Sequence, residues 1–309
     1  MFRLRKRRRP GRVYAIDRQQ ISGERSENLI YRKKVGNLYF WQIFPTVLKP
    51  TICLLFPLLL KLASTAQIIS NTPILTHKQV PILCYHQIRN WKAKDRQIDK
   101  DYIIPPVTFK AQMKMLSDSG YHTILPDELY DYLITGRTLP SKPVMITFDD
   151  TNEDQYAVAR PELAKYHFKA VYFIVTGHIG THKWYMDHEQ IKQLSDEGNV
   201  IGCHTLSHGN FKNLKEAAWE TEISLPKKQL EEITGKKVDY FAFPYGYWNT
   251  NGLPELYKRG FKAAFQLDQP RDLKYPIMTI RRIVACGYWN PETLDHHIKH
   301  DFGHPLKQL

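Results

Sequence analysis

The sequence predicts an α/β fold in which parallel strands alternate with helices and close into a barrel. From residue 80 onward, apolar runs of strand length alternate with segments whose apolar residues recur at helical spacing. Gly120, Gly198, Gly235 and Gly260 each follow a helical pattern, as glycines at helix C-termini do. Seven or eight such strand–helix units over roughly 220 residues suit a closed barrel better than an open sheet.

The individual elements follow from the same patterns, taken in chain order. The strand-like runs are short, rich in branched and aromatic residues, and each is followed by polar or small residues. They cover 80–85, 122–125, 144–148, 170–175, 200–203, 238–243, 262–265 and 279–285. The helical patterns cover 109–119, 156–167, 187–197, 216–234 and 253–259. We therefore expect a single domain over residues 80–309.

A basic tail, residues 1–46, begins the chain. The formal net charge is +13, yet residues 1–38 alone hold twelve Lys and Arg against three Asp and Glu. The basicity thus belongs to the tail, and the rest of the sequence shows no basic face interleaved with aromatic residues. We expect no nucleic-acid partner; a nucleic-acid tether through the tail is the weaker alternative.

Residues 47–66 are interpreted as a signal peptide or a membrane anchor. Their apolar core, 51–60, is shorter than the roughly 20 residues of a membrane span, and Ser64-Thr65-Ala66 resembles a cleavage site before Gln67. The tail is then either a mis-assigned start or the cytoplasmic end of an uncleaved anchor. Both interpretations predict an exported protein in the periplasm, at the cell surface or anchored to the membrane, with residues 67–79 as a linker.

The four cysteines form no Cys-x-x-Cys pair, so the sequence gives no support for a cysteine zinc cluster. Cys84 and Cys203 each end an apolar run directly before a polar site. We interpret both as small buried strand residues, with a disulfide between them as the alternative for an exported protein.

Two short stretches supply the groups of a metal site. Asp149 and Asp150 end the apolar run 143–148, and His204 and His208 follow a second such run. In a βα barrel the C-terminal ends of the strands meet on one face, so these side chains are expected to lie together. Two imidazoles and one carboxylate can hold a divalent metal with a position open for water, while the other carboxylate handles a proton. The pattern predicts a metal-dependent hydrolase.

Three motifs in this order resemble those of the polysaccharide deacetylases, carbohydrate esterase family 4. They are Thr147-Phe148-Asp149-Asp150, His204-Thr205-Leu206-Ser207-His208 and Phe243-Pro244-Tyr245-Gly246. The resemblance covers about residues 80–300. It implies a distorted (β/α) barrel of about seven strands that removes acetyl groups from N-acetylated sugars with a divalent metal, for which we expect Zn²⁺.

The resemblance also implies residue roles. Asp150, His204 and His208 would be the metal ligands, and Asp149 the general base. The backbone N–H of Tyr245 would help to hold the oxyanion, since a developing negative charge needs a donor aimed at it.

The arginine that usually precedes the Pro-Tyr motif of this family is absent, because Ala242 and Phe243 stand there. Arg281 or Arg282 is expected to supply the cation that holds Asp149, and Arg282 is the better placed of the two.

The general acid is expected to be His86, at the end of the first strand. The alternative is His296 in Leu294-Asp295-His296, but Pro291 indicates a helix start there.

An early Tyr-His resembles the branch of the family that deacetylates poly-β-1,6-N-acetylglucosamine. The predicted function is N-deacetylation of an N-acetylglucosamine polymer of the cell envelope or biofilm matrix. The alternatives are a peptidoglycan or chitin-oligomer deacetylase and a non-catalytic carbohydrate-binding barrel.

Four aromatic residues have two open interpretations. They could stack on sugar rings or pack in the core, and the sequence does not favour stacking for any of them. They are Trp184, Tyr185, Trp248 and Trp289.

Overall fold

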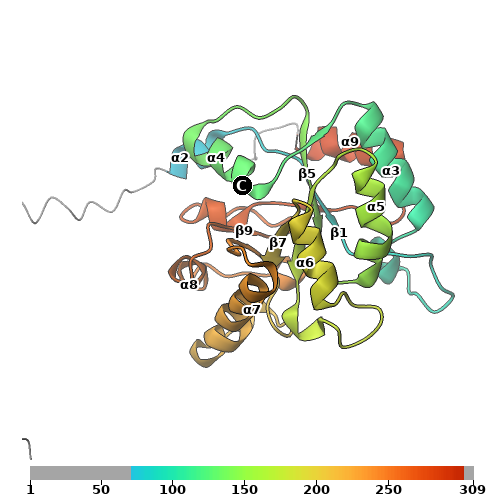
Figure 1. Cartoon of the computed structure of the whole chain (residues 1–309). Helices are drawn as coiled ribbons and strands as arrows, with labels where there is room; N and C mark the ends of the chain where they lie inside the picture. The colour runs from blue at the N-terminus through green and yellow to red at the C-terminus, as the bar shows by residue number, and fades with distance from the viewer. Residues whose placement is uncertain (1–70, 303–309) are drawn as a thin grey trace, which may run out of the picture. The chain divides into compact units, whose positions relative to one another are not determined.

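The alternating pattern folds into a curled parallel sheet surrounded by helices (Figure 1). The computed structural model describes residues 71–302. The strands follow the order β10-β1-β5-β6-β7-β8-β9, every pair is parallel, and β4 (His122–Thr123) pairs with the start of β5. The path strands are β1 (Ile82–Tyr85), β5 (Pro143–Phe148), β6 (Ala170–Ile174), β7 (Val200–Cys203), β8 (Tyr240–Ala242), β9 (Ala263–Phe265) and β10 (Ile283–Val284). The prediction of a distorted (β/α) barrel of about seven strands is confirmed.

The two ends of this sheet meet at an irregular seam. Phe265, at the end of β9, forms an isolated parallel bridge with Ile280. Gln266 N–H donates to the carbonyl of Ile280 at 2.9 Å, and Arg282 N–H donates to that of Leu267 at 3.0 Å. A few hydrogen bonds from bent chain thus replace a full strand pair at this point, which is where the barrel departs from regular geometry.

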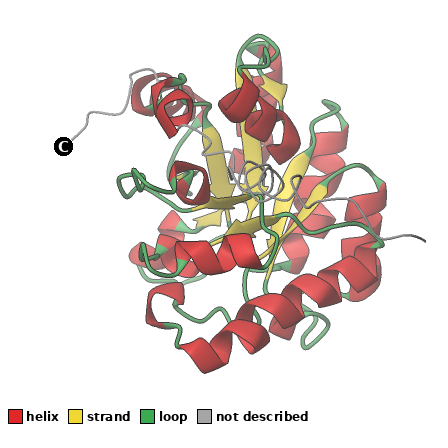
Figure 2. Cartoon of the chain, turned by 90° about the vertical axis from the view of Figure 1, so that its left-hand side faces the viewer, coloured by secondary structure: helices red, strands yellow, loops and turns green. Residues whose placement is uncertain are grey.

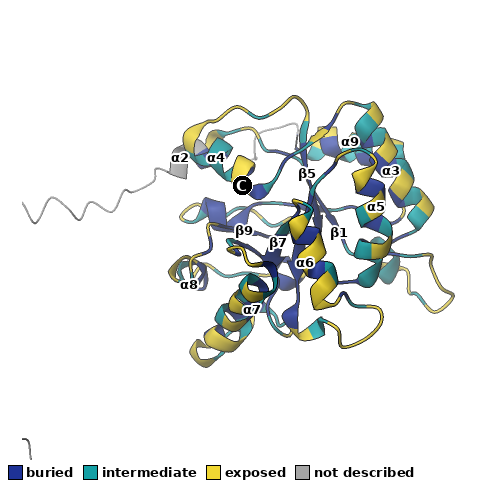
Figure 3. Ribbon diagram, in the orientation of Figure 1, coloured by how far each residue is buried: buried dark blue, intermediate teal, exposed yellow. Residues whose placement is uncertain are grey.

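Helices cover the outside of the sheet, as Figure 2 shows in a view turned by 90°. Their inner faces are buried and their outer faces exposed (Figure 3), as expected for amphipathic helices on a parallel sheet. They are α3 (Pro106–Asp118), α4 (Pro126–Thr135), α5 (Arg160–Ala164), α6 (His188–Asp196), α7 (Leu225–Thr234), α8 (Leu253–Lys258) and α9 (Pro291–Asp301). The four glycines expected after helices all have positive φ, between 67° and 89°.

Several short elements were not expected from the sequence. Helix α4 was not predicted, although Pro126, Leu129 and Leu133 form a buried face at helical spacing. Strands β2 (Gln87–Ile88) and β3 (Ile103–Ile104) pair in parallel and fasten the two ends of the loop between them. Two residues per strand carry no recognisable alternation, so only the tertiary structure reveals them.

The N-terminal predictions fall largely outside the described residues. The tail, 1–46, and the signal peptide or anchor, 47–66, both lie there. Part of the expected linker forms the short helix α2 (Asn71–Thr76), whose Ile74 is buried. Within residues 71–302, no helix has both the length and the hydrophobicity needed to cross a bilayer.

Candidate active site

The predicted site residues other than Arg282 gather at the C-terminal ends of β1, β5, β7 and β8. They line a cavity of about 290 Å³. Its walls are formed by His86, Gln87, Tyr102, Asp149, Asp150, His204, His208, Tyr245, Gly246, Tyr247 and Leu267. Chain segments up to about 180 residues apart in sequence therefore meet here because parallel strands end on one face of the barrel.

Asp150, His204 and His208 direct one ligand atom each towards a common point. Their nearest ligand atoms all lie within 4.8 Å of one another. Oδ1 of Asp150 is 3.1 Å from Nε2 of His208 and 3.6 Å from Nε2 of His204. This oxygen is buried yet has no hydrogen bond of good geometry. Three donor atoms that converge without bonding to each other fit a divalent cation.

The surroundings of His204 prepare it as a ligand. Its Nδ1 lies 2.8 Å from the carbonyl of Ala242, so Nδ1 carries the proton and Nε2 faces the site. Burial lowers the pKa of His204, but Asp149 and Asp150 outweigh burial and raise that pKa. Burial likewise opposes ionisation of Asp150, but the two imidazoles hold its pKa well below the usual range. A proton bound between these groups would compete with a cation for the same place.

Asp149 lies beside the ligand cluster, with its Oδ2 3.9 Å from Nε2 of His204, and is held by Arg282. The guanidinium donates from Nη1 to Oδ1 at 2.7 Å and from Nη2 to Oδ2 at 2.8 Å, a bidentate pair. Both side chains are almost wholly buried. Burial opposes ionisation of Asp149, but Arg282 and His204 outweigh it and lower its pKa to about 2. Asp149 is therefore a carboxylate at neutral pH.

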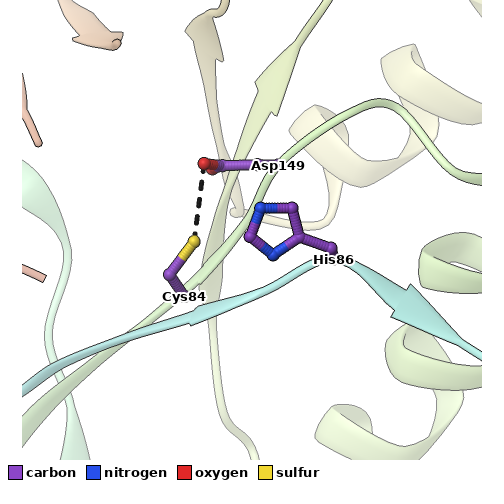
Figure 4. Close-up of side chains that lie close together, drawn as sticks. All are labelled: Cys84, His86 and Asp149. Carbon is purple, nitrogen blue, oxygen red and sulfur yellow. Dashed lines mark hydrogen bonds between the residues drawn. The ribbon is translucent and has the colours of Figure 1, made fainter. Parts of the chain in front are cut away.

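Cys84 adds a third donor to this carboxylate. Its Sγ–H donates to Oδ2 of Asp149 at 3.4 Å, and Figure 4 shows the imidazole of His86 beside this contact. The expectation of a small buried strand residue is correct as to burial. A cysteine in a strand gives no sign in the sequence that its thiol meets a carboxylate 65 residues away.

His86 lies on the same side of the cavity as Asp149. Its Nδ1 is buried and has no hydrogen-bond partner, and Tyr102 packs edge-on against its ring at 5.0 Å. Burial lowers the pKa of His86, while Asp150 and Asp149 act in the opposite direction. The other acid candidate, His296, is exposed on α9 and stacks with His300. The structure thus places His86, and not His296, in the cavity.

Gln155 is hydrogen-bonded to the backbones of both His86, the acid candidate, and Asp149, the base candidate. It was not predicted from the sequence as a site residue. Its Nε2 donates to the carbonyl of His86 at 2.9 Å and also to the carbonyl of Asp149. The residue is fully buried. Its place shortly after the Asp-Asp pair is the only signal, and a glutamine there would ordinarily be assigned to a solvated helix start.

Backbone strain is concentrated around the site. Five non-glycine residues near it have positive φ: Asp150 (77°), Thr151 (65°), Thr205 (68°), His208 (59°) and Tyr245 (59°). The left-handed region is unfavourable for side chains branched at Cβ, as in the two threonines. Such strain persists where the surrounding structure enforces it, and it often marks functional sites.

The structure also distinguishes between the alternatives that the sequence left open for Arg281, the cysteines and the four aromatic residues. Arg281 donates to the carbonyl of Asp301 and points away from Asp149. Cys84 and Cys203 are both free thiols, so the alternative disulfide is absent. Of the four aromatic residues, only Trp184 is exposed, at 54%.

A family model for polysaccharide deacetylases matches residues 136–264, which include Asp149, Asp150, His204, His208 and Tyr245. Over these residues the chain is similar to the polysaccharide deacetylase family. This similarity supports the predicted enzyme class, a hydrolase of carbon–nitrogen bonds other than peptide bonds.

Individual relatives agree with this assignment. The chain is 32% identical over 186 residues to YxkH of Bacillus subtilis, a match that covers 60% of this chain and 63% of YxkH. It is 29% identical over 209 residues to a poly-β-1,6-N-acetyl-D-glucosamine N-deacetylase of Staphylococcus aureus, covering 60% of this chain and 71% of that enzyme. Among solved structures, the Streptococcus pyogenes deacetylase PplD, in complex with acetate, superposes with a TM-score of 0.66. That match has 26% identity and covers 71% of this chain and 98% of PplD.

Proposed function

We propose that this protein is a metal-dependent N-deacetylase of an N-acetylglucosamine polysaccharide and that it releases acetate. One observation carries the proposal. Three converging ligand atoms lie beside a carboxylate, Asp149, that a buried arginine keeps ionised. A barrel that only bound carbohydrate would not need this arrangement, since burying an ion pair costs desolvation energy.

Asp150, His204 and His208 would hold the divalent ion, and Zn²⁺ is the expected one, since it favours imidazole and carboxylate ligands. Such an ion, when bound, lowers the pKa of water and polarises the amide carbonyl. Asp149 takes the proton of the attacking water. A carboxylate with a pKa of about 2 is a weak base, so it can act only on water that has already been acidified.

His86 and Tyr245 complete the reaction. An amine is a poor leaving group and must receive a proton, and His86 is an imidazole that lies beside Asp149 in the cavity. The backbone N–H of Tyr245 is offered by the strained turn Pro244–Gly246 and would donate to the oxyanion.

A β-linked N-acetylglucosamine polymer is the proposed substrate. The similarity to the Staphylococcus aureus enzyme, together with the placement of His86 at the end of β1, supports this class. A peptidoglycan or chitin oligomer is the alternative substrate within the same chemistry. Export through residues 47–66, or anchoring by them, is part of the proposal, since such polymers lie outside the cytoplasm.

The test is acetate release from a panel of acetylated polymers by purified protein of measured metal content. We expect release from poly-β-1,6-N-acetylglucosamine, its loss after chelation, and its recovery on adding Zn²⁺. Asp149→Asn should abolish turnover while the metal content is retained. If Asp149→Asn still releases acetate at the wild-type rate, the assignment of the base is wrong.

A second comparison tests the acid. His86→Ala should reduce the rate by about 10²- to 10⁴-fold, the usual contribution of general acid–base catalysis. His296→Ala should have little effect, because His296 is exposed on α9. The opposite result would assign the acid to His296.

N-terminal sequencing of the mature protein would show whether cleavage occurs before Gln67.

A further inference from the structure

The active-site cavity holds only a small part of a polymer. A volume of about 290 Å³ is at the lower end of ligand pockets, which span about 300–1,000 Å³. This space fits about one sugar unit. If the substrate is a polysaccharide, as proposed above, its neighbouring sugar units must lie on the protein surface outside the cavity.

A series of aromatic and imidazole rings leads out from the metal ligand Asp150. The imidazole of His178 lies close to the backbone of Asp150. Tyr185 stacks on His178 with ring centres 4.4 Å apart and planes 19° from parallel. Trp184 lies 6.3 Å from Tyr185 and stacks on His182 at 4.5 Å and 21°.

The backbone holds this ring series firmly against the strand-end loop of the site. Asn152 and Tyr185 form an antiparallel bridge. Glu153 N–H donates to the carbonyl of Trp184 at 2.9 Å, and Met186 N–H donates to that of Thr151 at 3.0 Å. Three residues of extended chain span at most about 10 Å, so the backbone of Trp184 lies within a few sugar units of Asp150.

Trp184 is the outermost ring of this series, and more than half of it is exposed. An indole supported by an imidazole on one side is a rigid flat apolar surface with a small entropic cost of ordering. The apolar C–H face of a pyranose ring is a fitting partner for such a surface.

We propose that Trp184 forms a sugar-binding subsite outside the catalytic cavity, where it stacks on an N-acetylglucosamine unit of the polymer adjoining the one being deacetylated. This inference rests on the proposed function and adds to it a preference for chains over short oligomers. The ring series from His178 to Trp184 fixes the position of the subsite relative to the metal ligands.

The experiment compares Trp184→Ala with the wild type on acetylated oligomers of increasing length and on polymer. For the wild type, we expect KM to fall as the chain lengthens. For Trp184→Ala, we expect KM for polymer to rise on the order of tenfold, with kcat and the values for the shortest active oligomer unchanged.

Matched variants separate stacking from folding or general surface effects. Trp184→Tyr keeps a flat ring and should retain most of the length dependence, whereas Trp184→Leu keeps hydrophobicity alone and should lose it. Tyr257→Ala removes an exposed aromatic residue from α8 and should change nothing. Tm of each variant reports folding. Unchanged length dependence in Trp184→Ala, or an equal loss in Tyr257→Ala, would overturn the proposal.

A direct binding measurement tests the Trp184 subsite independently of the proposed deacetylase activity. Affinity for acetylated polymer is measured in an Asp149→Asn background, where turnover is not needed. A loss of about tenfold on adding Trp184→Ala supports the subsite even if acetate release fails for another reason. Equal affinities with and without Trp184 would reject the subsite while leaving the deacetylase proposal intact.

Discussion

At the scale of single residues, the two adjacent aspartates show how environment divides identical side chains. Asp149 faces the guanidinium of Arg282, and Asp150 faces the imidazoles of His204 and His208. The first is thereby suited to receive a proton and the second to hold a cation. The positive φ of Asp150 turns the backbone between them, so neighbours in sequence serve different partners.

The thiol of Cys84 provides a residue-scale prediction with an internal control. Cys84→Ala removes one of three donors to Asp149, and we expect a several-fold loss of kcat with a loss of stability of about 1 kcal/mol. Cys84→Ser should recover part of the rate because its hydroxyl can donate. Cys203 is as deeply buried as Cys84 and directly precedes His204. Cys203→Ala should therefore lower stability without the same loss of kcat. Equal rate losses in the two alanine variants would contradict a positioning role for Cys84.

Asp154 gives a pH-dependent prediction. Burial raises its pKa to about 6, from an ordinary value of 3.8, and its Oδ1 is buried without a partner. Between about pH 4 and pH 6 the folded state therefore binds more protons than the unfolded chain, so stability falls as pH rises through this window. Asp154→Asn should remove this fall and stabilise the protein at pH 7 by roughly 1–3 kcal/mol.

Urea unfolding of the wild type and of Asp154→Asn at several pH values measures this effect. Asp118→Asn is the control, since Asp118 is exposed and pairs with Lys114 at the surface. A stability difference between wild type and Asp154→Asn that stays constant from pH 4 to pH 7 would show that Asp154 is not the group responsible.

At the scale of elements, the site depends on how the ends of β1 and β5 are held together. The strands pair from Ile82 to Tyr85 and from Met145 to Phe148, and the chain leaves both at the cavity. Beyond the last strand hydrogen bonds, the side chain of Gln155 connects the two chain segments through hydrogen bonds to the carbonyls of His86 and Asp149. It stands at the start of a π-helical turn, Gln155–Ala159, an irregularity often found at functional sites.

Gln155→Leu is expected to loosen this junction. It leaves two carbonyls without their donor, which should cost roughly 1–3 kcal/mol of stability. It should also lower kcat by about tenfold or more, since small misplacements of catalytic groups are costly. Gln112→Leu is the matched control: this buried glutamine bonds Tyr85 and Trp289 and should affect stability alone. Acetate release and urea unfolding distinguish the two variants.

At the scale of the whole molecule, Arg282 links the barrel seam to the catalytic face. It precedes β10, and its guanidinium reaches Thr147 and Asp149 of β5 and its end. Its Nε donates to the carbonyl of Gln266 after β9. One buried side chain that precedes β10 thus contacts both β5, within the sheet, and the segment after β9, at the other end of the sheet order, so site and closure depend on each other.

Replacing Arg282 alone should destabilise the protein more than replacing Arg282 and Asp149 together. Arg282→Met leaves the Asp149 carboxylate buried without a counter-ion, and we expect a loss of about 3–5 kcal/mol. The double variant Asp149→Asn with Arg282→Met should recover most of this stability while remaining inactive. Unfolding free energies of the single and double variants measure the coupling. A double variant as unstable as Arg282→Met would place the defect in the seam rather than in the unpaired charge.

The sequence by itself determined the fold class and the approximate positions of eight strands along the chain, because strand-length apolar runs and helix-ending glycines are local signals. It also placed His86, Asp149, Asp150, His204 and His208 at strand ends, where a parallel barrel brings them together. Tertiary structure alone decided between Arg282 and Arg281, because a change of one residue reverses the face on which a side chain lies. Likewise, the roles of Cys84, Gln155 and Trp184 depend on contacts between distant segments, which no local pattern encodes.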